Sequence, residues 1–284
     1  MKHFLDILNE KYNFTDEIAR IAILFNSKLL YTDPYSLGPL HRRYTTLENV
    51  FNTELFSGWK GRLSCINIED LKNALNIEYK SGGIPNIEND DDILKYLEYY
   101  INICTVFAKS PICSHYNKTG DYTILSENIF MLLDHMNYEI IAIPDKQSFK
   151  IVPKNPQGAA VAEISTPHTG LAILQYNHRA LKGDLIGKSK ILAAIANEYE
   201  DILKNAPDGH KELFDKTRGL CNQLCIRHTN STNKCNVEKL SDTELEKWYD
   251  DLYQMLLLCV LINDNIKHKR TDRARELLAS FNGK

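Results

Sequence analysis

The chain has 284 residues, of which 43% are hydrophobic and 10% aromatic, and its formal net charge is −3. This length suits one large domain or two ordinary ones, and the apolar share is typical of a globular protein with a core. The small negative charge argues against a surface that coats nucleic acid or adsorbs to membranes, so a contact with RNA would need a local basic patch.

Export and membrane insertion are not expected. The longest uninterrupted apolar run is Met255 to Ile262, far short of a bilayer span. The N-terminal sequence MKHFLDILNEKYNF is amphipathic and contains acidic residues, so it lacks the apolar core of an export signal. The seven cysteines are scattered, and we therefore expect reduced thiols in a cytoplasmic protein.

The first third of the chain has mostly helical patterns. Apolar residues recur at helical spacing in two long segments, and two short helices are expected between them, the first opened by a Thr45–Glu48 capping box. These predicted helices cover residues 15–31, 46–56, 68–77 and 91–109. Residues 33–44 and 81–92 are rich in turn formers and predict loops. We predict a helical N-terminal region over residues 1–120.

The pattern changes in the middle of the chain, after a predicted helix at 126–136. Three short β-rich segments are separated by turn residues: 138–143, 148–152 and 159–164. They predict a small antiparallel meander inserted at about 138–164. Three short strands are not stable by themselves, so the neighbouring helices are expected to cover them.

The last third is helical again. Asp184 is a predicted cap, and Ser241 and Glu244 form a predicted capping box. The predicted helices cover residues 172–180, 185–204, 213–228 and about 242–266, followed by a short basic helix at the end. The long antiparallel helices suggest an up-and-down bundle. The expected fold class is therefore mainly α, a helical bundle with a small antiparallel β meander inserted, and its second domain spans 121–284.

The segment at 213–228 contains the residues best suited to chemistry. Five side chains fall within an arc of about 120° on a helix: Arg218, Cys221, Asn222, Cys225 and His228. An imidazole can activate a ribose 2′-hydroxyl because its pKa lies near neutrality. A guanidinium, from Arg218 or Arg227, matches phosphate oxygens and can stabilise a charged phosphorane. The same residues would equally suit a solvated helix end that caps its last carbonyls.

The sequence CNQLCIRHTN, residues 221–230, resembles the Arg-Asn-x(4–6)-His motif of the HEPN superfamily. It is similar in particular to the abortive-infection C-terminal domains, whose motif has the form RNKYGxxHG. Asn222 and His228 match the motif's asparagine and histidine, whereas Cys221 stands where the motif has arginine. Arg218 or Arg227 would have to replace that arginine. The resemblance covers roughly residues 125–267, including the predicted helices on either side of the motif.

The resemblance implies a helical bundle that dimerises, so that two motif helices form one RNA-cleaving cleft. We therefore expect a defence-associated endoribonuclease, of abortive-infection or toxin–antitoxin type, that needs neither metal nor cofactor. His228 would act as general acid or base, Asn222 would orient, and Arg218 or Arg227 would stabilise the phosphate. Expected partners are RNA such as tRNA, a second copy of the chain, and an antitoxin or defence-system protein. The departure at Cys221 leaves open a catalytically inactive module that binds RNA, a nucleotide or a partner protein.

Two further groups of residues suggest a binding site, one for zinc and one for RNA, and each also has a purely structural explanation. Four residues have side chains that zinc accepts, although their spacing matches no familiar finger and buried reduced cysteines are commoner: Cys221, Cys225, His228 and Cys235. Six basic residues form two candidate RNA-binding patches, for which solvated charge is the alternative: Arg42, Arg43, Lys267, Lys269, Arg270 and Arg273.

Overall fold

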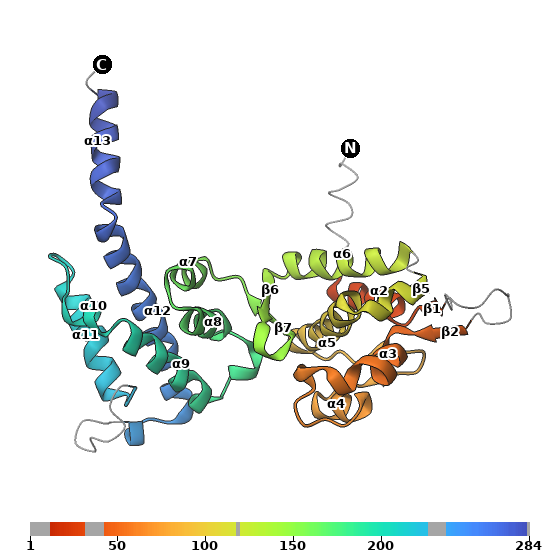
Figure 1. Ribbon diagram of the computed structural model, residues 1–284. Coiled ribbons are helices and arrows are strands. Elements are labelled where there is room, and N and C mark those ends of the chain that lie inside the picture. Colours follow the sequence, from red (N-terminus) through yellow and green to blue (C-terminus); the bar gives the residue numbers. More distant parts are fainter. Residues whose placement is uncertain (1–11, 32–42, 118–119, 227–236, 283–284) are drawn as a thin grey trace. The chain divides into compact units, whose positions relative to one another are not determined.

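The computed structural model describes residues 12–31, 43–117, 120–226 and 237–282, which belong to two compact units, residues 1–154 and 155–284 (Figure 1). Both units are mainly helical, and the described strands form small antiparallel sheets in the first, so the predicted fold class is confirmed. The units divide after Lys154 and not near residue 120, because the helix and hairpin between these positions pack on helices of the first unit. No helix in the described ranges has the length and apolar character needed to cross a bilayer.

The first described helix of the first unit is α2 (Phe14–Phe25), which is capped by Asn13. The Asn13 side-chain oxygen accepts the backbone N–H of Thr15 at 2.8 Å. The helix is shorter than the predicted one, since the chain continues as a strand that pairs with two distant segments. This sheet has the order β2-β1-β5 and is antiparallel, with β1 (Lys28–Tyr31), β2 (Arg43–Thr46) and β5 (Tyr116–Asn117). Such long-range pairing has no signal in local periodicity.

Short helical segments follow, and they differ in detail from the predicted helix at 46–56. Thr46 is the cap of α3 (Leu47–Val50), one position later than predicted, and accepts the N–H of Asn49 at 3.2 Å. The next elements are a π turn (Phe51–Leu55), 3-10 turns (Phe56–Gly58 and Lys60–Arg62), α4 (Ile68–Ala74) and the two-stranded hairpin β3 (Tyr79–Lys80) and β4 (Ile84–Pro85).

Helix α5 (Asp90–Lys109) is the centre of the first unit. It packs on α2, α3, α6 (Gly120–His135) and the strand β7 (Ser148–Pro153). Residues on most of its circumference are buried, which is the pattern of a helix enclosed by other elements; they include Tyr96, Leu97, Tyr100, Ile103 and Phe107. The Tyr96 hydroxyl also accepts the backbone N–H groups of Glu78 and Asn86, at 2.9 and 3.2 Å.

The strands β6 (Tyr138–Ile143) and β7 (Ser148–Pro153) form the predicted antiparallel hairpin. Side chains of α5 satisfy the outer backbone groups of β7. The Asn102 amide donates to the Phe149 carbonyl at 2.9 Å and its oxygen accepts the Phe149 N–H at 2.8 Å, while Glu98 accepts the N–H of Ile151 at 3.0 Å. Asn102 and Glu98 thus make hydrogen bonds to β7 that a third strand would otherwise make.

The third predicted strand, 159–164, is helical. It lies in α7 (Pro156–Ile164), the first helix of the second unit. Asn155 caps this helix by accepting the N–H of Gly158 at 3.0 Å, and Pro156 occupies a position at the start of a helix that suits its fixed φ. The capping signal at Asn155 and Pro156 therefore outweighs the β-rich appearance of AAVAEI.

The second unit is built around one long helix, α12 (Asp242–Lys267), which begins with the predicted Ser241–Glu244 capping box. It packs on four other helices and continues into α13. The helices around it are α7, α9 (Leu185–Glu198), α10 (Glu200–Lys204) and α11 (Lys211–Gln223), with α8 (Pro167–Gln175) packed on α7 and α9 and α13 (Arg270–Asn282) at the end of the chain. The Asp184 cap of α9 is confirmed, since its carboxylate accepts the Gly187 N–H at 2.8 Å.

Helices α7 and α8 cross closely at a glycine. A Cβ added to Gly170 would lie 2.7 Å from the carbonyl oxygen of Ala162, on the backbone of the other helix. In contrast, a Cβ added to Gly219 in α11 would meet no atom within 4 Å. The close helix crossing therefore requires a glycine at position 170, whereas no neighbouring atom requires one at position 219.

Gly170→Ala is expected to lower the free energy of unfolding by about 1–3 kcal/mol, because backbone must move to admit the methyl group. Gly219→Ala is the matched control and should raise it by about 0.5–1 kcal/mol, since alanine restricts the unfolded chain and fills open space. Urea unfolding of the full chain, followed by circular dichroism, measures both. Equal stabilities of the two variants would contradict the close crossing.

Candidate functional site

The face of α11 that packs on α12 differs from the predicted one. Its buried residues lie at helical spacing, and they are Phe214, Thr217, Cys221 and Leu224. The leucines of this segment predict a core face formed by Leu213, Leu220 and Leu224, but Leu213 and Leu220 are only half-buried and only Leu224 is buried. Thr217 satisfies its hydroxyl within the helix by donating to the Leu213 carbonyl at 2.8 Å. The helix is therefore rotated about its axis relative to the expectation from its leucines.

This rotation places Cys221 in the core. Its exposed fraction is 0%, and it belongs to the same buried cluster as Phe214 and Cys259. A small, weakly polar side chain suits that position, whereas a guanidinium there would be buried among apolar groups. The position that the resemblance aligns with the arginine of the HEPN motif thus belongs to the packed interior in this chain, not to an open face.

Arg218 and Asn222 lie on the flank of α11, one turn apart, so their side chains are neighbours. Arg218 is 39% exposed and forms an ion pair with Asp215 at 3.0 Å. The Asn222 side-chain oxygen is buried and accepts no hydrogen bond from any described residue. An unsatisfied buried carbonyl of this kind is uncommon and is an acceptor available to a hydrogen-bond donor.

Helix α11 ends earlier than the predicted helix at 213–228. Its last helical residue is Gln223, and Cys225 has the left-handed conformation with φ of 56°. The N–H of Ile226 donates to the Cys221 carbonyl at 2.9 Å and the N–H of Cys225 to the Asn222 carbonyl at 3.3 Å. These two bonds are the Schellman arrangement that terminates helices. The expected common arc therefore holds for Arg218 and Asn222 but not for Cys225.

The remaining residues of the predicted site, Arg227, His228 and Cys235, lie outside the described residues, as does Arg42. Cys225 is disulfide-bonded, so the expectation of reduced thiols fails there. Five other cysteines are free and buried: Cys65, Cys104, Cys113, Cys221 and Cys259. Within the described part of the chain, no group of three or more His, Cys, Asp or Glu residues could hold a metal ion.

The C-terminal basic residues are exposed at the junction of α12 and α13, where Lys269 has a φ of 50°. Arg270 is ion-paired with Asp264. Lys267, Lys269 and Arg273 form no ion pair with a described residue, so their charges are open to a partner. Of the other predicted patch, only the backbone of Arg43, in β2, is described.

A cluster of charges around the buried Lys188 of α9 was not predicted. Lys188 is 8% exposed and contacts two carboxylates of α12, Asp250 at 2.6 Å and Glu246 at 2.9 Å. Tyr176 donates to Asp250 at 3.0 Å, and burial raises the pKa of this phenol, which keeps it protonated. Glu246 and Asp250 are four residues apart, so the sequence already places both carboxylates on one helical face. It does not show that Lys188 is their partner. Two carboxylates neutralise the ammonium, and we assign the cluster to holding α9 on α12.

Comparison with family models, with curated proteins and with solved structures gave no match for this chain. The residues that bear on function are therefore those of the motif, in the positions that α11 gives them.

The Gly183 backbone N–H and the Lys188 ammonium hold the pKa of the Glu246 carboxyl below its usual value. Its ionised form consequently stabilises the fold above the unfolded pKa, and this contribution disappears as the pH falls through the lowered folded pKa. Glu246→Gln should thus be less stable than the parent at pH 7, by about 1 kcal/mol. The difference should shrink as the pH falls through this lowered pKa, because the Glu246 carboxyl then becomes neutral, as the glutamine is.

Urea unfolding of both proteins at a series of pH values measures this difference. Glu238→Gln is the control, since Glu238 is exposed and has no ion-pair partner among the described residues. A Glu246→Gln penalty that stays constant down to pH 3 would show that the carboxylate charge does not contribute.

Proposed function

We propose that residues 155–284 act as an endoribonuclease of abortive-infection or toxin–antitoxin type that needs no metal ion. The observation that carries the proposal is the pair on the flank of α11, where a partly exposed guanidinium of Arg218 neighbours the buried oxygen of Asn222, which accepts no hydrogen bond from a described residue. Both residues precede the histidine of the motif by at most ten positions in the sequence. The motif resemblance supplies the reaction class.

In this proposal His228 is the general acid or base that moves the proton of the ribose 2′-hydroxyl. Arg218 stabilises the charge that develops on the phosphate, and it must exchange Asp215 for the phosphate to do so. Such an exchange costs little free energy, because a surface ion pair of this kind contributes little stability. Asn222 accepts a hydrogen bond through its free oxygen and thereby orients the histidine or the ribose. Arg227 is the alternative phosphate ligand.

The burial of Cys221 favours a second candidate. The motif arginine is absent, and its position is closed to solvent. If Arg218 and Arg227 cannot replace it, the unit would bind RNA, a nucleotide or a partner protein without cleaving. The exposed Lys267, Lys269 and Arg273 would contribute to RNA binding in both cases.

The two candidates differ in an assay of RNA cleavage. Purified protein should degrade tRNA or total RNA in the presence of EDTA, and His228→Ala should reduce the rate by about 10²-fold or more, the usual contribution of a general acid or base. Arg218→Ala should also reduce it strongly, by about 10²-fold. Lys216→Ala is a matched control, because Lys216 is an exposed residue of the same helix, ion-paired with Glu212.

Binding of RNA without cleavage by the parent protein would favour the second candidate. Cleavage that is equal in parent and His228→Ala would remove this histidine from the mechanism. Growth of bacteria that express either protein provides a second comparison, because an active toxin should arrest the culture and the variant should not.

The proposal includes a homodimer, and α13 offers a surface for it. Every described side chain of this helix is exposed, including the apolar residues Leu277, Leu278 and Phe281 at 56%, 60% and 66%. Together with Ala274 they recur at helical spacing and form one apolar stripe. Such a stripe is costly in water, and a second copy of α13 would cover it with an identical one.

Leu278→Glu should therefore shift the protein from dimer to monomer, because it places a charge in the apolar stripe. Ser280→Glu, on the polar side of the same helix, should leave the dimer intact. Sedimentation equilibrium of the full chain distinguishes the two states. A parent protein that is monomeric at high micromolar concentration would contradict the dimer.

A further inference from the structure

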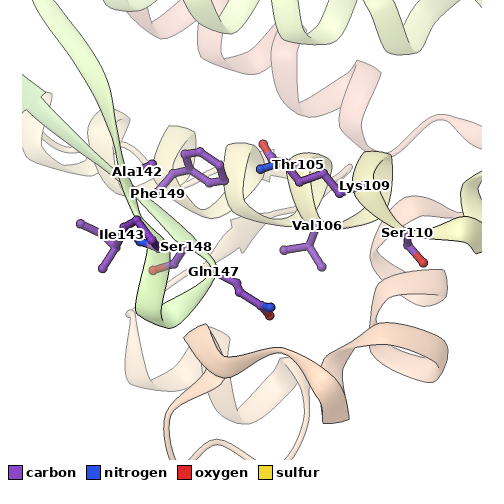
Figure 2. Close-up of a pocket in the computed structure, with 10 residues that line it drawn as sticks. Thr105, Val106, Lys109, Ser110, Ala142, Ile143, Gln147, Ser148 and Phe149 are labelled. Carbon is purple, nitrogen blue, oxygen red and sulfur yellow. The ribbon is translucent and has the colours of Figure 1, made fainter.

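A cavity of about 450 Å³ lies in the first unit, between the C-terminal half of α5 and the β6–β7 hairpin (Figure 2). Its volume is within the range of small-molecule sites, about 300–1,000 Å³. Figure 2 shows the residues of α5 on one side and those of the hairpin on the other. This cavity belongs to residues 12–154, and its interpretation does not rest on the proposed ribonuclease activity.

The walls of the cavity are held in place by buried hydrogen bonds. Asn102, 7% exposed, makes the two bonds already described with the backbone of Phe149, which fixes the strand that carries one wall. At the hairpin turn, the indole N–H of Trp59 donates to the Gln147 carbonyl at 2.8 Å. A cavity with walls fixed in this way loses little conformational freedom when a ligand enters.

The lining combines apolar surface with a few polar groups. Val106, Ile143 and Phe149 provide apolar contact, and the hydroxyls of Thr105 and Ser148 provide hydrogen bonds. No acidic residue is among those that line the cavity. A flat aromatic side chain with an aliphatic one beside it suits a planar ring.

The charge in the cavity comes from Lys109. Its ammonium lies 5.2 Å from the centre of the Phe149 ring, and Figure 2 shows its side chain extending toward that ring. Lys95, on the same helix, lies at a similar 5.5 Å from the Tyr96 ring but is also ion-paired with Asp92 at 2.9 Å. Lys109 forms no ion pair with a described residue. Asp92 therefore neutralises Lys95, whereas Lys109 is available to an anion.

The position of Lys109 at the end of α5 limits the charge of the anion that it can bind. Lys109 is the last residue of α5, and the carbonyl end of a helix is negative. A single ammonium next to this end balances one negative charge, and the negative helix end disfavours a second one, such as that of a dianionic phosphate. We propose that the cavity binds a small carboxylate attached to a planar ring system, with Lys109 as its counter-ion and Phe149 and Val106 against the ring.

The test uses 2-naphthoate and its uncharged analogue 2-naphthamide as probes, with isothermal titration calorimetry on the full chain. Naphthoate should bind the parent at least about tenfold more tightly than naphthamide. Lys109→Met should abolish this preference and Lys109→Arg should retain it. Lys146→Met is the matched control, since Lys146 is an exposed lysine of the same hairpin that does not line the cavity, and it should change neither affinity.

Val106→Trp tests the location independently, because the larger side chain should fill the cavity and abolish binding of both probes. Circular dichroism and thermal melting establish that each variant is folded. Absence of naphthoate binding to the parent, or unchanged binding in folded Lys109→Met or Val106→Trp, overturns the proposal. Tighter binding of adenosine monophosphate or inorganic phosphate than of naphthoate overturns the carboxylate class.

Discussion

Cys221 is completely buried where α11 packs on α12, and this contact sets the rotation of α11 about its axis. With Thr217 and Cys221 turned to the interior, the residues that directly follow them in the helix must lie on its flank. Arg218 and Asn222 are these residues. The same packing excludes the motif's arginine position from any open site, so the chemistry proposed for the second unit depends on whether a guanidinium one turn earlier can serve instead.

Each unit contains a buried polar side chain that is satisfied by groups far away in the sequence. In the first, Asn102 pairs with both backbone groups of Phe149, 47 residues later. In the second, Lys188 is neutralised by Glu246 and Asp250, from a helix that begins more than 50 residues further along. Loss of one partner would leave a buried amide or charge without compensation, which makes these contacts specific to one arrangement of the helices. One of them also shapes the proposed ligand cavity, because it fixes the position of Phe149.

Elements with local signals were predictable. The Ser241–Glu244 capping box and the Asp184 cap locate the starts of α12 and α9, and short β-rich segments separated by turn residues locate β6 and β7. Elements that need distant partners were not. The strand at Lys28–Tyr31 continues an apolar helical pattern and becomes a strand only because β2 and β5 pair with it. The segment at 159–164 shows the reverse case, in which a cap at Asn155 and close packing on α8 make a β-rich sequence helical.

The sequence by itself determined the mainly α class, the positions of the capped helices, and the asparagine and histidine on which the resemblance to a ribonuclease motif rests. These follow from local hydrogen bonding and from periodicity, which act within a few residues. Only the tertiary structure decided which face of α11 is buried, that the helix ends at Gln223, and that Lys109 faces a cavity beside Phe149. The physical reason is that burial is a property of neighbours in space, and a leucine at the right spacing can lie at the edge of a core while a cysteine fills its centre.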